Sequence, residues 1–125
     1  MNKQLVEVVL PRLARTLYHE LERYRSGKLD EDEFSTCFEN LLQRQHRWLM
    51  ARGVPEMRAA LAIHGAVLVL SMPGLRAEAA EEGLPLEVME QRAIREAATD
   101  VASNFGVPPV KAMRILSKIV ARYGD

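Results

Sequence analysis

The sequence predicts an all-α protein: a single-domain bundle of five or six helices around a central apolar helix at about 56–72. Every position of the stretch 59–72 except His64 suits a protein interior, and a helix that is apolar on every side belongs in the middle of a fold. Three Gly-X-Pro triplets divide the chain, at 53–55, 83–85 and 106–108. In each triplet the glycine suits a helix end and the proline suits the start of the next helix. No segment alternates apolar and polar residues for long enough to predict a sheet.

The first two helices follow from periodicity and capping. An apolar pattern of helical spacing covers residues 2–26 and continues across Pro11, where we expect a kink. The second helix has the clearest start in the chain, because Asp30 and Glu33 have the spacing of a capping box. We expect Gly53 to end it.

Four further segments complete the predicted bundle. The central helix opens after Pro55 and is expected to close at Pro73-Gly74, since proline and glycine both disfavour helix interiors. A short Ala- and Glu-rich helix at 75–82 follows, and then a helix at 85–105. The last helix begins at Pro108 or Pro109 and ends at Tyr123.

Composition limits the classes of protein. Lys plus Arg and Asp plus Glu both number 17, so the whole chain has no polyelectrolyte character. The lone cysteine, Cys37, excludes an intramolecular disulfide. The first residues lack the pattern of a signal peptide, and the apolar stretch 59–72 is too short to cross a bilayer. We therefore expect one domain over 1–125, in the cytoplasm and not in a membrane.

Histidine is the one residue type that suggests a site in the core. His19, His46 and His64 fall one to each of the first three predicted helices. None has a glutamate three residues before it, and no His-x-x-x-His pair occurs, so neither a di-iron nor a helical zinc pattern is present. We predict no metal and no cofactor. His64 is interpreted as a buried polar residue, with a ligand site as the alternative.

Catalytic patterns are missing from the sequence. No Gly-x-Ser-x-Gly turn and no glycine-rich phosphate loop occurs. Cys37 lies on the predicted buried stripe of its helix, where a thiol is usually inert. We expect no catalytic residue and no enzymatic activity.

The last third of the chain resembles the helix-turn-helix core of repressor-type DNA-binding proteins, within the predicted helix pair at about 96–122. The matching positions are Val101, Ala102, Phe105, Gly106, Val107, Ala112 and Ile115. The sequence departs from that pattern where side chains would face the bases. Pro109, Val110 and Met113 stand there, and none can hydrogen-bond to a groove edge.

The last predicted helix also carries four cations at spacings of three, four and four: Lys111, Arg114, Lys118 and Arg122. This spacing places them on one helical face. Such a face can contact phosphates, pair with an acidic helix such as 75–83, or simply be solvated.

Two functions follow as expectations. The first is a small non-enzymatic helical protein that acts through protein–protein contact and self-associates as a homodimer. Its predicted contact surface is the apolar remainder of the last helix, at Val110, Met113 and Val120. The alternative is a helix-turn-helix-like nucleic-acid-binding regulator that uses the helix pair at 96–122.

Overall fold

A computed structural model describes residues 2–124, with side chains described from residue 5 onward. Five α-helices occupy this range: α1 (Asn2–Arg25), α2 (Glu31–Ala51), α3 (Glu56–Glu82), α4 (Leu86–Phe105) and α5 (Pro109–Tyr123). No strand occurs among these residues. The prediction of an all-α bundle is therefore confirmed.

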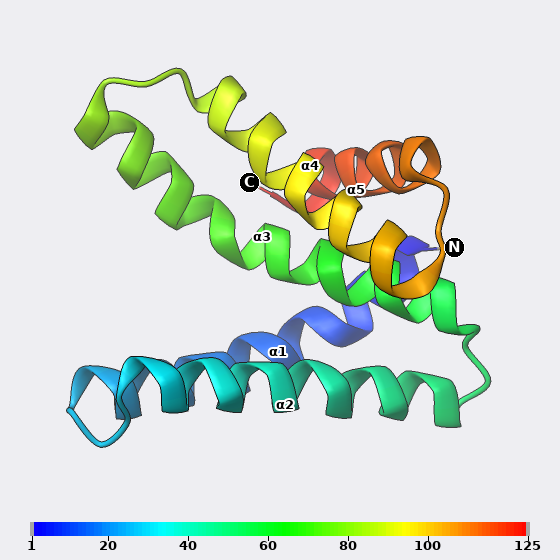
Figure 1. Cartoon of the computed structure of the whole chain (residues 1–125), viewed down its shortest axis with the longest axis horizontal. Coiled ribbons are helices and arrows are strands. Elements are labelled where there is room, and N and C mark those ends of the chain that lie inside the picture. Colours follow the sequence, from blue (N-terminus) through cyan, green and yellow to red (C-terminus); the bar gives the residue numbers. More distant parts are fainter. Residues whose placement is uncertain (1, 125) are drawn as a thin grey trace.

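Helix α3 is the central element, as its apolar sequence predicted. The antiparallel pair α1 and α2 packs on one side of it, and α4 and α5 pack on the other (Figure 1). Ala59, Ile63 and Ala66 join the core cluster shared with α1 and α2. Leu61 and Leu68 join the cluster shared with α4 and α5. Because α3 has two packed sides, it has no polar face over this stretch.

The prediction that the central helix ends at Pro73-Gly74 is wrong. Helix α3 continues to Glu82, so the separate short helix at 75–82 does not exist. Proline lacks an N–H, which leaves the carbonyl of Val69 without its backbone donor. Met72 and Ala79, 1% and 4% exposed, are buried before and after the proline, and their packing outweighs that loss.

The continuous α3 also removes one argument against a membrane span. Its 27 residues extend about 40 Å, more than the hydrocarbon core of a bilayer. Over the described part of the chain, α3 is the one helix apolar and long enough to cross a membrane. However, 56% of its most apolar window is buried within the fold. The core helix of a soluble protein has the same property.

The capping box and the glycine-terminated helix ends that the sequence predicted are present. Asp30 accepts a hydrogen bond from the Glu33 backbone at 2.8 Å, and the Glu33 side chain accepts one from the Asp30 backbone. Gly83 and Gly106 adopt left-handed conformations, with φ of 68° and 72°, and end α3 and α4. Helix α1 continues through Pro11. These ends give tight corners between α3, α4 and α5.

Candidate functional site

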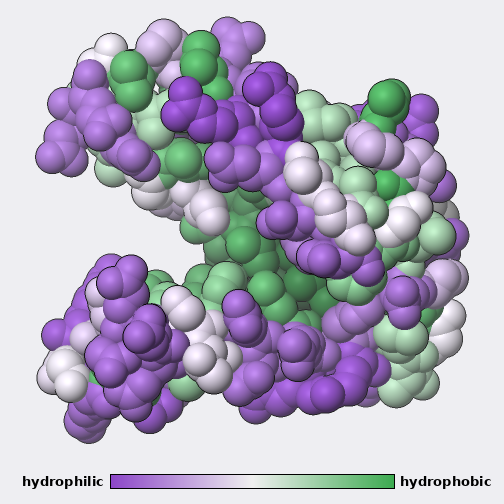
Figure 2. All heavy atoms as spheres, viewed as in Figure 1, coloured by the Kyte–Doolittle hydropathy of each residue, from purple (hydrophilic) through white to green (hydrophobic). Residues whose placement is uncertain are grey.

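An open cleft is the largest departure of this molecule from a closed bundle. It separates the α1–α2 pair from an arm built by the second half of α3 and the first half of α4, and hydrophobic residues cover its floor (Figure 2). In the described part of the chain, no Cα atom of α2 lies within 8 Å of one in α4. The helix α3 alone therefore holds the two sides together along most of the cleft.

The fold leaves several apolar side chains half-buried on α2 and α3, the helices beside the cleft. On α2, residues spaced by four share one helical face. They are Phe34, Phe38, Leu42 and His46, and all four are half-buried. On α3, Val67 lies one turn beyond His64 and is also half-buried, as is Leu70. Phe38, Leu42, Val67 and Leu70 pack against the core below them and expose the rest of their surface.

Phe105 and two histidines close the inner end of this cleft. The Phe105 ring at the end of α4 meets His46 of α2 at 5.1 Å and His64 of α3 at 6.2 Å between ring centres, both edge-on. A pocket of about 90 Å³ lies between these rings, with Leu42, Gln43, Ala60 and Ile63 as its other lining residues. This pocket is where α2, α3 and α4 meet.

The hydrogen bonds of the two histidines define their chemistry. His64 Nδ1 lies 2.8 Å from the Ala60 carbonyl oxygen, so this nitrogen is the donor and Nε2 is left as the acceptor of the neutral ring. His46 Nε2 lies 3.2 Å from the Glu56 carbonyl oxygen and is likewise a donor. His64 is thus satisfied by its own helix, which supports the structural interpretation. His19 is exposed on α1 and does not line the pocket.

The described side chains around this pocket form no cluster of metal-binding residues. Across residues 2–124, no group of three or more His, Cys, Asp or Glu side chains is placed to hold an ion. The two histidines of the pocket have only apolar neighbours and Gln43 beside them. The pocket therefore suits an apolar group with one polar atom better than a cation.

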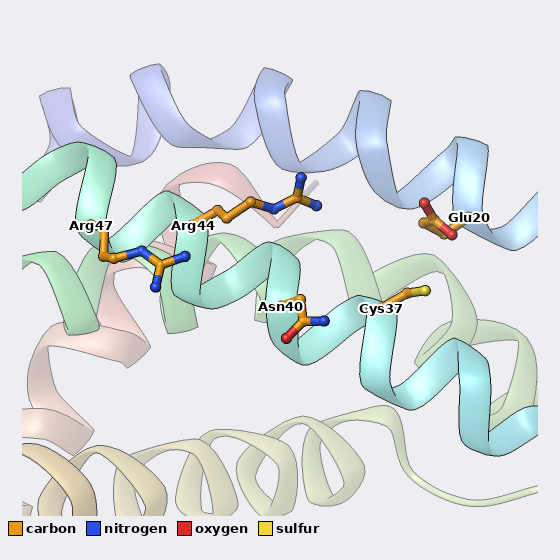
Figure 3. Close-up of a pocket in the computed structure, with 5 residues that line it drawn as sticks. All are labelled: Glu20, Cys37, Asn40, Arg44 and Arg47. Atoms are coloured by element: carbon orange, nitrogen blue, oxygen red, sulfur yellow. The ribbon is translucent and has the colours of Figure 1, made fainter.

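A second concave surface lies between α1 and α2. Glu20 of α1 and four residues of α2 line it, namely Cys37, Asn40, Arg44 and Arg47, around a volume of about 370 Å³. Figure 3 shows both arginines extending from α2, with Glu20 lying toward the Cys37 end. Glu20 pairs with Arg23 at 3.1 Å. Its charge is thereby compensated within α1.

The tryptophan next to this surface carries two arginines. The guanidinium carbons of Arg12 and Arg52 lie 4.2 Å and 3.8 Å from the centre of the Trp48 ring. Arg12 Nε also donates to Gln45 Oε1 at 3.2 Å, and Gln45 is buried. Two guanidinium groups are therefore fixed beside Trp48.

The four cations predicted on the last helix are all exposed on α5. Lys111, Arg114, Lys118 and Arg122 share one face, as their spacing predicted. Lys111 also lines a shallow pocket with Arg58 and Met57 of α3, of about 190 Å³.

The apolar surface predicted on α5 is not present. Val120 is 5% exposed, and Met113 is half-buried against the core, so Val110, at 80% exposed, stands alone. The reason is that α5 packs against α3, α4 and also α1. Its buried stripe is correspondingly wider than that of a helix with one neighbour.

Two contacts between distant residues were not predicted from the sequence. The sequence placed His46 and His64 on successive helices but gave no sign that Phe105, 41 positions beyond His64, lies between them. It also gave no sign that Arg12 reaches Trp48. In comparisons with family models, curated proteins and solved structures, nothing matches this chain.

Proposed function

We propose that this chain is a non-enzymatic helical protein that acts through protein–protein contact and forms a homodimer through the cleft between α2 and α3. The observation that carries the proposal is the pair of half-buried apolar stripes on either side of that cleft. Phe38 and Leu42 on α2, and Val67 and Leu70 on α3, are half-buried and pack against the core cluster that these helices share. Contiguous exposed apolar surface on a small protein typically marks an interaction site.

Covering the cleft has a clear driving force. Each square ångström of apolar surface removed from water contributes about 25 cal/mol. The pocket between His46, His64 and Phe105 lies at the inner end of the same surface. Interfaces commonly place one anchoring side chain in such a pocket, surrounded by weaker contacts that exclude water.

Two features favour a second copy of this chain as the occupant. The molecule offers both a cleft (Figure 2) and a projecting arm of α3 and α4 (Figure 1), and a two-fold axis would place the arm of each copy in the cleft of the other. The formal net charge is zero, so two copies approach without overall electrostatic repulsion. The proposal treats α3 as the core helix of a soluble, cytoplasmic protein, which its 56% burial supports.

Light scattering after size exclusion tests the dimer, with a matched pair of variants. Val67→Asp puts a charge in the cleft, and Val110→Asp puts the same charge on the exposed start of α5. We expect wild type and Val110→Asp to have the mass of a dimer at high concentration, and Val67→Asp to have that of a monomer. Val67→Ser, which removes apolar area without adding a charge, should weaken the dimer less. Circular dichroism checks that each variant is folded.

Two results would overturn the proposal. One is a wild-type protein that stays monomeric at the highest attainable concentration. The other is a folded Val67→Asp variant that dimerises as strongly as wild type does.

The alternative function is a helix-turn-helix-like nucleic-acid binder, and one observation favours it. Gly106 makes a tight left-handed corner between α4 and α5, and Val107 of that corner is buried, as in the pattern the sequence resembles. The four exposed cations of α5 would then contact phosphates. A titration of labelled duplex DNA tests this function. It predicts that Lys111→Gln/Lys118→Gln weakens binding and lowers its salt dependence.

A further inference from the structure

We propose that the surface around Trp48 is a separate binding site for the phosphate groups of a single nucleic-acid strand. We call it the arginine face and define it by Arg12, Arg44, Arg47 and Arg52. All four side chains are exposed. The assignment rests on their arrangement along α2, on how they are held, and on the lack of acidic partners.

The arginines form a row along one side of α2. Arg44, Trp48 and Arg52 follow one another at intervals of four residues, and Arg47 lies about one turn beyond Arg44. Eight residues of helix rise about 12 Å, so the row from Arg44 to Arg52 is longer than one phosphate group. Arg12 joins this row from α1 through its contact with Trp48.

Two members of the row are held before any ligand arrives. Arg52 stacks on Trp48 at 3.8 Å and donates from Nη1 to the Trp48 carbonyl oxygen at 3.2 Å. Arg12 stacks on the same ring at 4.2 Å and bonds to buried Gln45. A guanidinium fixed in this way loses less conformational freedom on binding an anion, and its planar fork matches phosphate oxygens.

The row lacks acidic partners. Within residues 2–124, no carboxylate oxygen lies within 4.0 Å of a guanidinium nitrogen of these four arginines. Glu20, the acid that lines the concave surface, is paired with Arg23 of its own helix. Like charges gathered without counterions repel one another, and an anion relieves that repulsion.

The neighbouring residues favour a phosphate chain over an acidic peptide. A peptide interface is usually centred on an aromatic or aliphatic anchor. The surface beside Arg44 and Arg47 is lined by Asn40, Cys37 and Glu20, and none of these is a large apolar side chain. Two guanidiniums already stack on the Trp48 ring, so a base would have to compete with them for it. Recognition is therefore of the backbone and independent of base sequence.

The arginine face is distinct from the dimer surface. Helical residues two positions apart point about 200° away from each other, so Arg44 faces away from Leu42, which lines the cleft. Strand binding and dimerisation can thus be tested separately. A variant that loses strand binding should still dimerise, and a variant that loses dimerisation should still bind the strand.

The single tryptophan gives a local reporter for this site. The probe is the single-stranded oligonucleotide dT20, titrated at 20 mM salt while Trp48 fluorescence is recorded, with anisotropy of labelled dT20 as a second readout. We expect a saturable change in Trp48 emission. The variant Arg44→Gln/Arg47→Gln leaves the Trp48 contacts in place and should weaken dT20 binding at least about tenfold. The matched control on α5, Lys111→Gln/Lys118→Gln, should bind like wild type.

Further arms of the experiment identify the ligand class. Binding of dT20 should fall with salt at a slope of about −0.7 per phosphate contacted, and dA20 should bind equally well. No saturable change at 20 mM salt would overturn the proposal, as would an equal loss in the α5 control. If inorganic pyrophosphate displaces dT20 when both are at the same concentration, the assignment of the site to a nucleic-acid strand is overturned. Tighter binding of a polyglutamate peptide than of dT20 would assign the face to a protein partner instead.

Discussion

The Cδ1 atom of Ile119 lies 2.6 Å from the position that a Cβ atom on Gly65 would occupy, and Ile119 Cγ2 lies 3.0 Å from it. Helix α5 therefore approaches the backbone of α3 at a point where a Cβ atom would force the Ile119 side chain to shift. Ile119 is buried, and it belongs to the small cluster that joins α1, α3 and α5. Gly65 is the residue that allows this three-way contact.

The substitution Gly65→Ala should lower the free energy of unfolding by roughly 1–2 kcal/mol. Overpacking typically costs 1–3 kcal/mol, and the better helix propensity of alanine offsets part of it. In an Ile119→Ala background, the atom nearest to the added Cβ would lie at an ordinary van der Waals distance. Gly65→Ala should therefore raise the free energy of unfolding in that background. Gly74→Ala is the control, because its Cβ would meet nothing within 4 Å. Urea denaturation measures each effect, and equal effects of Gly65→Ala in the two backgrounds would contradict this account.

The capping box of α2 should be measurable in the same way. Asp30→Ala removes the acceptor of the Glu33 N–H bond and should cost about 1 kcal/mol. Asp30→Asn keeps an acceptor and should cost little. Asp32→Ala, in the same first turn, removes only a charge near the positive end of the helix and serves as the control. A loss as large for Asp32→Ala as for Asp30→Ala would exclude the specific capping bond.

Pro73 should destabilise the native protein. Alanine at this exposed position would restore an N–H donor to the Val69 carbonyl, so Pro73→Ala should raise the free energy of unfolding by about 1–3 kcal/mol. Pro108, which precedes α5, is the control, because its substitution adds no helical bond. The denaturation midpoint should increase for Pro73→Ala with no change in m value. A lower midpoint would mean that the proline itself contributes packing.

The His64 ring should be a single tautomer. Because its Nδ1 faces the Ala60 carbonyl oxygen at 2.8 Å, the neutral ring carries its proton on Nδ1. Long-range ¹H–¹⁵N spectra at a pH where the ring is neutral should show this form for His64. Phe105→Leu should shift the ring protons of His46 and His64 together, since both rings lie edge-on to Phe105. Exposed His19 is the internal control.

The elements that sequence analysis predicted correctly depend on local physics. The Asp30–Glu33 box and the glycines at 83 and 106 act within a few residues, so their effect can be derived from the chain alone. The continuous α3 could not be derived in this way. At Pro73 a local helix-breaking tendency competes with burial of Met72 and Ala79, and only the packed fold decides the outcome.

The candidate sites depend still more on long-range placement. Periodicity predicted that the four cations of α5 share a face, and they do. The prediction that Val120 is exposed is wrong, because the number of helices that contact α5 cannot be derived from the sequence of α5 itself. The Phe105 contacts with His46 and His64, and the Arg12 contact with Trp48, join helices far apart in the chain. No local pattern encodes them.

The dimer proposed to form through the α2–α3 cleft is the central claim, and the single cysteine allows a direct measurement of it. One spin label on Cys37 gives one label per chain, so electron–electron dipolar spectroscopy reports only distances between chains. We predict a discrete intermolecular distance for the wild type and for Val110→Asp, and its loss in Val67→Asp. A featureless background decay in the labelled wild type at high concentration, or the same distance in folded Val67→Asp, would contradict the claim.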